Sequence, residues 1–173
     1  MTATAERQRW VVETMAVAPG DRVLEIGCGR GVAVSLICQR LGSGKITAID
    51  RSAAMVRIAS QRSAAYVESG MAEVRCEEFE KVTFPVGHFD KIFAVNVSLF
   101  WLDTAPGHID RVKRLLAPEG MLYVFSERPT LAGANAIGDR TGTLLRAHGF
   151  TAERITVNSS RGNPLTCVSG AVS

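Results

Sequence analysis

The spacing of apolar positions changes repeatedly along the chain. Residues 5–17 place apolar side chains at helical spacing, whereas 22–26 and 89–97 are short, nearly continuous apolar runs typical of strands buried on both faces. Serine at position 52 is placed to cap a helix that passes through Met55, and Pro118 is placed to end another. The pattern predicts helices at 5–17, 32–41, from 53 toward 70, 105–116 and 134–148, and strands at 22–26, 45–49, 73–76, 89–97, 121–125, 155–158 and 165–169.

This alternation of strands and helices predicts a parallel sheet with helices on both faces and right-handed crossovers. The last two strands are separated by the short, turn-rich segment SSRGNP, so we expect them to pair as an antiparallel hairpin. No repeat or linker interrupts the 173 residues, which favours a single domain over 1–173. In such folds a ligand lies beyond the carboxyl ends of the strands, and the candidate motifs fall at those ends.

Composition is that of an ordinary globular protein, with 46% hydrophobic and 21% charged residues and a formal net charge of +3. Lysine and arginine are scattered, and the densest group, Arg111, Lys113 and Arg114, is typical of a solvated helix face. The sequence therefore makes nucleic acid an unlikely partner.

The four cysteines form no CxxC pair, and no histidine stands at metal-ligand spacing, so we expect free thiols and no metal site. The first ten residues lack the apolar core of a signal peptide, and no apolar run approaches the roughly 20 residues of a membrane span. We expect a cytoplasmic protein without a membrane partner.

The most informative segment is a glycine turn between the first strand and the next helix, VLEIGCGRG. Its glycines Gly27, Gly29 and Gly31 allow a sharp bend and close approach to a ligand at a helix N-terminus. The third position of a dinucleotide fingerprint is Val32, and Glu25 would be a poor neighbour for a pyrophosphate. A carboxylate there suits a ligand with an ammonium and a sulfonium, such as S-adenosylmethionine (SAM), so an NAD-dependent oxidoreductase is disfavoured.

Asp50 ends the second strand, about 20 residues after the glycine turn. Rossmann-type folds place an acid there on the ribose hydroxyls, and a carboxylate accepts both bonds of a cis-diol. In isolation the segment Asp50-Arg51-Ser52 could equally be a helix cap, but together with Glu25 and the glycines the ribose role is favoured.

Four segments together resemble the class I SAM-dependent methyltransferases of the small-molecule type: LEIGCGRG, AID, VRCEEFEKVTFPVGHFDKI and LLAPEGMLYVF. They cover most of the chain, from about Trp10 to the final hairpin. The resemblance implies an α/β fold: a Rossmann-like, doubly wound, mostly parallel seven-stranded sheet with an antiparallel strand in the C-terminal hairpin. It implies SAM as the cofactor and transfer of its methyl group to a small-molecule acceptor by in-line displacement.

The resemblance also assigns residues to parts of the cofactor. Glu25 and the three turn glycines would hold the methionine part, and Asp50 would bind the ribose. Arg51, Met55, Glu78 and Phe79 would surround the adenine, with Glu78 standing where the family often has aspartate. Asn96 would lie near the methionine part or the transferred methyl group.

The acceptor side is less defined. Ser98 and Trp101 could line the acceptor pocket, with core packing as an equal alternative for Trp101, and the helix within residues 1–20 would cover the cofactor site. A general base is needed only if the acceptor must lose a proton, and no residue is favoured among His108, His148, Asp103 and Glu127. A SAM-binding protein without methyl transfer (a cyclase or a regulator), a methyltransferase acting on RNA or protein, and closure of the pocket in a homodimer remain alternatives.

Overall fold

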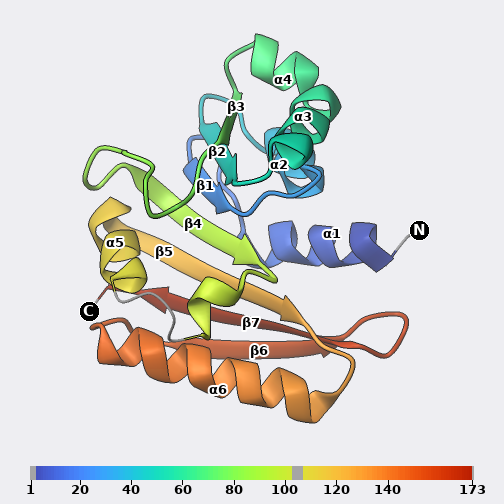
Figure 1. Cartoon of the computed structure of the whole chain (residues 1–173), viewed down its shortest axis with the longest axis vertical. Coiled ribbons are helices and arrows are strands. Elements are labelled where there is room, and N and C mark those ends of the chain that lie inside the picture. The colour runs from blue at the N-terminus through green and yellow to red at the C-terminus, as the bar shows by residue number, and fades with distance from the viewer. Residues whose placement is uncertain (1–2, 103–106, 173) are drawn as a thin grey trace.

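The computed structural model describes residues 3–102 and 107–172, which form a seven-stranded sheet in the order β3-β2-β1-β4-β5-β7-β6 (Figure 1). All neighbouring strands are parallel except β7, which is antiparallel to both β5 and β6. The strands are β1 (Arg22–Ile26), β2 (Lys45–Asp50), β3 (Ala72–Cys76), β4 (Phe89–Val95), β5 (Leu116–Glu127), β6 (Glu153–Asn158) and β7 (Pro164–Ala171). The expected Rossmann-like fold and its antiparallel terminal hairpin are confirmed.

Helices cover both faces of this sheet. They are α1 (Ala3–Met15), α2 (Val32–Cys38), α3 (Ala53–Arg62), α4 (Ala64–Glu68), the short 3-10 helix η1 (Ser98–Phe100), α5 (His108–Leu115) and α6 (Leu131–Ala147). Chain order rises outward from β1 toward β3 on one side and from β4 toward β5 on the other, so the carboxyl ends of β1 and β4 flank the point where the winding reverses. That is where a doubly wound fold forms its ligand crevice.

Two apolar cores lie on opposite faces. One contains Val11 and Met15 of α1 together with Val34 and Ile37 of α2, and these pack on Val23 of β1. The other joins alternate strand residues to α5, α6 and the segment after β3, and includes Leu24, Phe79, Ile92, Val112 and Leu145. Because successive side chains of a strand point to opposite faces, Glu25 lies on the α1–α2 side and Ile26 on the α5–α6 side.

The structure refines several predicted boundaries. β4 ends at Val95 rather than residue 97, because Asn96 adopts a left-handed conformation (φ 57°) that leaves the strand. The helix after Ser52 ends at Arg62 and a separate short helix follows. β5 begins at Leu116, directly after α5, and its register with β4 shifts near Phe89. The expected helix start at Ala105 lies outside the described residues.

Candidate functional site

The turn after β1 and the end of β2 are joined by backbone hydrogen bonds. The Gly27 and Cys28 N–H groups donate to the Ile49 carbonyl at 2.8 and 3.0 Å. The Gly29 N–H donates to Asp50 Oδ2 and the Ser52 N–H donates to Asp50 Oδ1, both at 2.9 Å. Each Asp50 oxygen therefore keeps acceptor capacity for one further donor, as a cis-diol requires.

Two glycines of this turn have opposite surroundings. Both have positive φ, 52° at Gly29 and 71° at Gly31. A Cβ at Gly31 would lie 2.7 Å from Ala59 Cβ and 2.8 Å from Ala59 Cα, because α3 packs against the turn. A Cβ at Gly29 would meet nothing within 4 Å. Gly31 is thus required for packing, whereas Gly29 borders open space beside Asp50.

Glu25 is a buried carboxyl group with an unmet hydrogen-bonding atom. Its side chain is 2% exposed, and its Oε2 has no partner among the described residues. Burial, with the nearby Asp50 charge as a smaller cause, raises the pKa of Glu25 well above its usual range. A cationic ligand group beside it would supply both the missing partner and the compensating charge.

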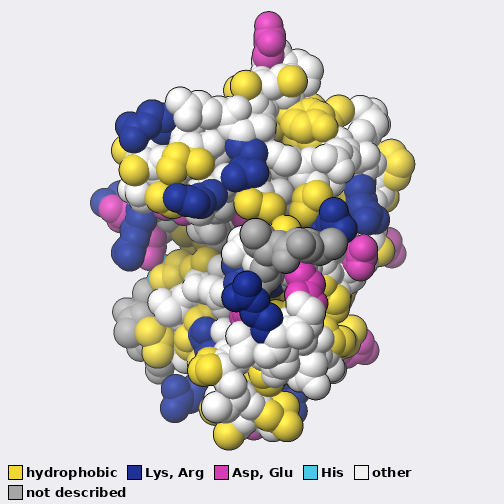
Figure 2. Space-filling model, turned by 90° about the vertical axis from the view of Figure 1, so that its right-hand side faces the viewer, with side chains coloured by type: hydrophobic (Ala, Val, Ile, Leu, Met, Phe, Trp, Pro, Cys, Tyr) yellow, Lys and Arg dark blue, Asp and Glu magenta, His cyan; other side chains and the backbone are white. Residues whose placement is uncertain are grey.

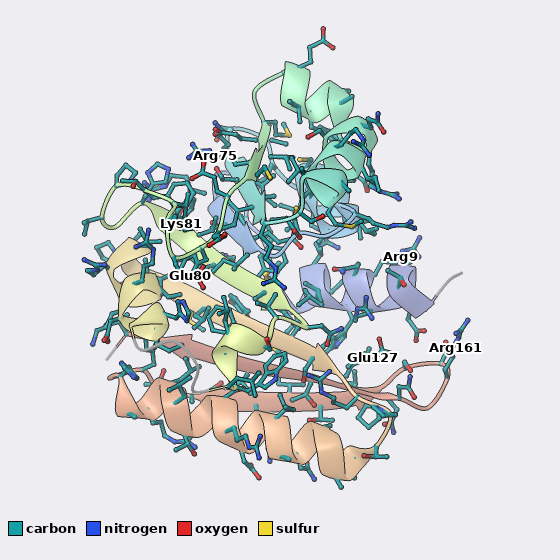
Figure 3. The ribbon with its side chains drawn as sticks, in the orientation of Figure 1. Arg9, Arg75, Glu80, Lys81, Glu127 and Arg161 are labelled. Atoms are coloured by element: carbon teal, nitrogen blue, oxygen red, sulfur yellow. The ribbon has the colours of Figure 1, made fainter. Side chains whose placement is uncertain are left out.

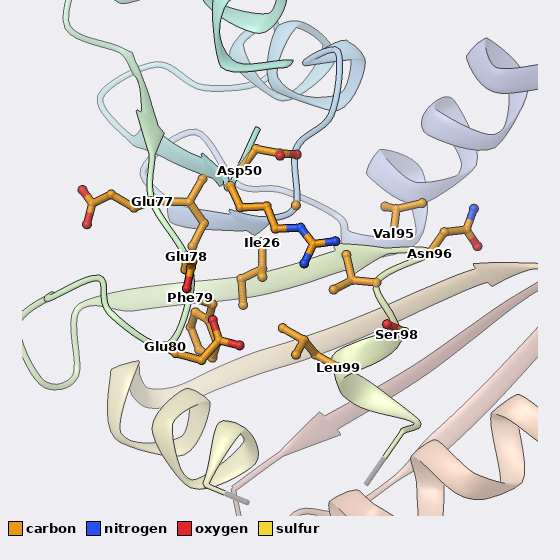
Figure 4. A pocket seen from close by; sticks show the side chains of 14 residues that line it. Ile26, Asp50, Glu77, Glu78, Phe79, Glu80, Val95, Asn96, Ser98 and Leu99 are labelled. Carbon is orange, nitrogen blue, oxygen red and sulfur yellow. The ribbon is translucent and has the colours of Figure 1, made fainter. Parts of the chain in front are cut away.

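A pocket of about 370 Å³ opens at the carboxyl ends of the central strands (Figure 4). Figure 4 shows Glu77, Glu78, Phe79 and Glu80 from the segment after β3 on one side, and Asn96, Ser98 and Leu99 on the other, with Asp50 and Ile26 between them. The pocket therefore has an acidic side with an aromatic ring and a side of small polar and apolar residues.

The segment after β3 is fixed to α5. The Phe79 ring is 3% exposed, and the Arg111 guanidinium lies over it, 5.5 Å from the ring centroid. Arg111 also donates a hydrogen bond to the Val82 carbonyl, and His108 Nε2 lies 3.1 Å from Glu80 Oε1. These contacts hold Phe79 in place without a helix between β3 and β4.

The sequence-predicted residues fall into two groups. Seven line the pocket: Gly27, Asp50, Arg51, Glu78, Phe79, Asn96 and Ser98. The other five, Glu25, Gly29, Gly31, Met55 and Trp101, lie outside its lining. Glu25 and Gly29 border the same turn, whereas Met55 contributes a backbone N–H that Ser52 Oγ accepts at 3.4 Å.

Trp101 packs in the core on the α5–α6 side and is 8% exposed. The Arg128 guanidinium lies over its ring, 4.9 Å from the centroid. With residues of α6 such as Leu144 it also lines a second hollow, separate from the pocket at the strand ends.

The general-base candidates are occupied with structural contacts. His148 Nδ1 lies 2.8 Å from Asp110 Oδ1, which ties α6 to α5. His108 pairs with Glu80, and Glu127 forms an ion pair with Arg7 of α1. Asp103 lies outside the described residues.

Several apolar residues that line the pocket were not predicted from the sequence, namely Ile26, Ile49, Val95, Val97 and Leu99. Each of them is directly next to a predicted site residue in the sequence, and this position along the chain is the signal that could have identified them. Contacts of α1 with the end of β5 were also missed. The described part of α1 contributes no side chain to the pocket lining.

Within 3–102 and 107–172, no group of three or more His, Cys, Asp or Glu side chains is arranged to hold a metal ion. In the same ranges no helix is long and apolar enough to cross a membrane. The face in Figure 2 shows Lys and Arg side chains scattered among acidic and apolar ones.

A family model described as "Methyltransferase domain" matches residues 23–120. Trans-aconitate 2-methyltransferase of Escherichia coli K12 is 39% identical over 127 residues, which are 70% of this chain and 46% of that protein. The chain thus spans about half the length of this curated relative.

Solved structures share the fold at low sequence identity. A SAM-dependent methyltransferase from Aquifex aeolicus aligns with a TM-score of 0.74 and 20% identity, over 95% of this chain and 89% of that one. The [4+2]-cyclase SpnF aligns with a TM-score of 0.79 and 17% identity, over 97% and 81%. Because both identities are low, these likenesses concern the fold.

Proposed function

The chain belongs to the methyltransferase domain family, and we propose that it transfers a methyl group from SAM to a small-molecule acceptor. The main support for this proposal is Asp50, which lines the pocket. The Gly29 and Ser52 N–H groups each donate a hydrogen bond to one of its two carboxylate oxygens and so orient them. This geometry leaves one acceptor position on each oxygen for the hydroxyls of a ribose.

The remaining residues fit the other parts of SAM. Glu25, with its buried and unpartnered Oε2, would hold the ammonium group, and the open space at Gly29 would admit the methionine part. Glu78 and Phe79 would face the adenine from the segment fixed by Arg111. When bound, SAM supplies a methyl group on a positively charged sulfur.

The side of the pocket near β4 favours an acceptor that is already nucleophilic. Asn96, Ser98 and Leu99 line it, and the described lining residues include no histidine, lysine or tyrosine. The chain would therefore align and desolvate the acceptor rather than deprotonate it. A carboxylate acceptor meets this condition, and trans-aconitate, named in the relative from E. coli, is the first compound to test.

We further propose that residues 1–173 act as one domain in the cytoplasm. α1 packs on the sheet face beside α2, and its first turns reach the end of β5, so it would cover the acceptor end of the site. A homodimer and exclusion of nucleic acid stay predictions.

The test is calorimetric titration of SAM, S-adenosylhomocysteine (SAH) and NAD into the wild type and Asp50→Ala. We expect SAM and SAH to bind, NAD not to bind, and Asp50→Ala to weaken SAM by at least about 30-fold, since two charge-assisted bonds are lost. Asp90→Ala is the matched control. Asp90 also accepts a strand-end N–H, from Arg22 at 2.8 Å, but near the amino ends of β1 and β4.

Turnover separates the alternatives. SAH released only when a small carboxylic acid is added would support the proposed reaction. SAM binding without SAH release from any acceptor class would favour the SAM-binding alternative, and SAH release dependent on RNA or protein would favour the macromolecular one. A wild type that binds NAD but not SAM would contradict the proposal outright.

A further inference from the structure

Polar side chains of α1 contact the end of β5 and the β6–β7 turn. Arg7 Nη1 forms an ion pair with Glu127 Oε2, and the two side chains are only 20% and 13% exposed. The other oxygen of Glu127 accepts a hydrogen bond from Asn163 Nδ2 at 3.2 Å. Glu6 accepts hydrogen bonds from the Ser160 N–H at 2.7 Å and the Ser160 hydroxyl at 2.6 Å. Figure 3 shows Glu127 at the tip of β5 below α1, on the side of the turn that carries Arg161.

An apolar contact accompanies these polar ones. The Trp10 ring meets Phe125 of β5 edge to face, with centroids 5.4 Å apart. Arg7 and Trp10 therefore seat the first part of α1 on the end of β5, and Glu6 holds it to the β6–β7 turn.

The same glutamate also orients a pocket residue through its backbone. The Glu127 N–H donates to Asn96 Oδ1 at 2.9 Å, while the Asn96 N–H donates to the Phe125 carbonyl at 2.9 Å. Because an N–H group can only donate, the accepting atom of the Asn96 amide must be its oxygen. Its Nδ2 group is then the one left to donate elsewhere, and Asn96 is a pocket-lining residue.

We propose that Arg7 and Glu127 form a latch that couples the seating of α1 to ligand binding in the pocket through Asn96. A ligand oxygen that accepts a hydrogen bond from Asn96 Nδ2 would fix the Asn96 side chain, whose Oδ1 accepts from the Glu127 N–H. The Glu127 carboxylate in turn pairs with Arg7 of α1. The latch contains positioning residues only. The identity of the ligand rests on the proposed function, whereas the seating of α1 by the latch does not.

Coupling of this kind is reciprocal. If a ligand favours the seated form of α1, loss of seating must weaken that ligand by the same factor. A helix held by few contacts at one end also exchanges its amide protons faster when those contacts are removed. Both quantities can be measured on the full chain.

The experiment measures hydrogen–deuterium exchange of residues 5–15 with and without saturating SAH, together with SAH affinity by calorimetry. The variants are Arg7→Gln, which removes the charge, and Arg7→Lys, which restores it. The matched control is Lys91→Gln. Lys91 pairs with Asp21 with side chains 15% and 13% exposed, a similar burial, at the other end of the sheet.

We expect SAH to slow exchange of residues 5–15 in the wild type and Arg7→Gln to abolish that slowing. Arg7→Gln should speed exchange in the ligand-free protein and weaken SAH about fivefold, the lower range for coupled sites. Arg7→Lys should regain the SAH-dependent slowing, and Lys91→Gln should behave like the wild type.

Two results would overturn the latch: unchanged exchange of residues 5–15 in Arg7→Gln, or equal changes in Arg7→Gln and Lys91→Gln. Faster exchange in Arg7→Gln with unaltered SAH affinity would overturn the coupling. Failure of the wild type to bind SAH would contradict the proposed function and the coupling to it. The ligand-free exchange rates would still decide whether Arg7 seats α1.

Discussion

The two halves of the sheet hold their site residues by different means. In the β1–β2–β3 half, the Gly29 N–H donates to the carboxylate of Asp50, which is 21 residues further along the chain. The donor in this contact is a backbone group. In the β5–β7–β6 half, Glu127 meets Arg7 across 120 residues and Ser160 meets Glu6 across 154, and both contacts involve side chains. The first half thus holds the proposed cofactor site through contacts between segments close in sequence, whereas the second assembles the proposed acceptor end from segments far apart in the sequence.

The difference predicts how the halves respond to substitution. Substitutions in the glycine turn should affect cofactor binding or folding directly, because rearrangement of side chains cannot replace a backbone hydrogen bond that is lost. Changes at the β5 end should act through the seating of α1.

The largest effect on binding is expected at Gly29. Alanine there would extend into the open space beside Asp50, where a Cβ meets no protein atom within 4 Å, and would occupy room proposed for the methionine part of SAM. We expect Gly29→Ala to weaken SAM at least about 30-fold while lowering the free energy of unfolding by about 1 kcal/mol, the cost of alanine at positive φ. Calorimetry and urea unfolding measure the two effects. Normal SAM affinity would show that the cofactor does not lie over this turn.

Gly31 is the matched position in the same turn, with the opposite expectation. A Cβ would lie 2.8 Å from the Ala59 Cα, and a backbone atom of α3 cannot move aside cheaply. We expect Gly31→Ala to lower the free energy of unfolding by about 3 kcal/mol, from overpacking added to backbone strain. Urea unfolding measures it. A loss no greater than that of Gly29→Ala would show that α3 adjusts and that the turn is less rigid than its contacts indicate.

The contrast also explains which parts of the site could be predicted from the sequence. Glu25, the turn glycines and Asp50 stand at the ends of apolar strands, so the chain order alone brings them together. The left-handed Asn96 within an apolar run gave no strand-ending signal, and β4 was expected to continue to residue 97. Arg7, Glu127 and Asn163 are ordinary polar residues in sequence. The packing of α1 on the sheet brings Arg7 to Glu127, and the antiparallel pairing of β5 with β7 brings Asn163 to it.

The surroundings of two aromatic residues also follow from packing rather than from sequence. Phe79 and Trp101 are both aromatic residues after a strand, yet Phe79 lines the pocket and Trp101 packs below Arg128. The residues around Phe79 and Trp101 in the sequence do not show which of the two lines the pocket, because this depends on which helix packs against the segment after each strand.

Glu25 gives a pH-dependent prediction for the cofactor half. Burial, with the Asp50 charge as a smaller cause, raises the pKa of Glu25, so its carboxyl keeps a proton to higher pH in the ligand-free protein than an exposed glutamate does. A ligand ammonium favours the ionised form, so SAM affinity should fall as the pH is lowered through the raised pKa, and binding should release protons. Glu25→Gln should bind SAM more weakly, with a flatter pH profile and less proton release.

Titration of SAM in buffers of different ionisation enthalpy counts the released protons. The contribution of Glu25 to the free energy of unfolding should change with pH in the direction opposite to the change in SAM affinity. A carboxyl whose pKa is raised by folding contributes stability below its ordinary value near 4.5, and this contribution is lost as the pH rises through the raised value. Equal proton release in the wild type and Glu25→Gln would exclude Glu25 as the ammonium partner.

The smallest effect is expected for an ion-pair cluster in the β1–β2–β3 half whose members, Glu73, Arg75 and Lys45, lie outside the pocket lining. Glu73 of β3 accepts from Arg75 Nε at 2.6 Å and from Lys45 Nζ at 2.9 Å, and its side chain is 34% exposed. These two hydrogen bonds, that from Arg75 first, lower the pKa of Glu73 from 4.5 to about 2. Solvent screening limits such pairs, so Glu73→Gln should cost less than about 1 kcal/mol at neutral pH.

Because the pKa of Glu73 is lowered, its contribution is present above pH 4.5 and is lost as the pH falls toward 2. The difference in the free energy of unfolding between wild type and Glu73→Gln, measured with urea, should therefore vanish as the pH falls through that window.

Lys45→Gln is the control, since it removes one of the two partners of Glu73 and leaves Arg75 in place. SAM affinity and the exchange of residues 5–15 should be unaltered in both variants, because neither the glycine turn nor α1 touches this pair. A change in either quantity would mean that the two halves of the sheet are coupled more widely than through Asn96 and Glu127.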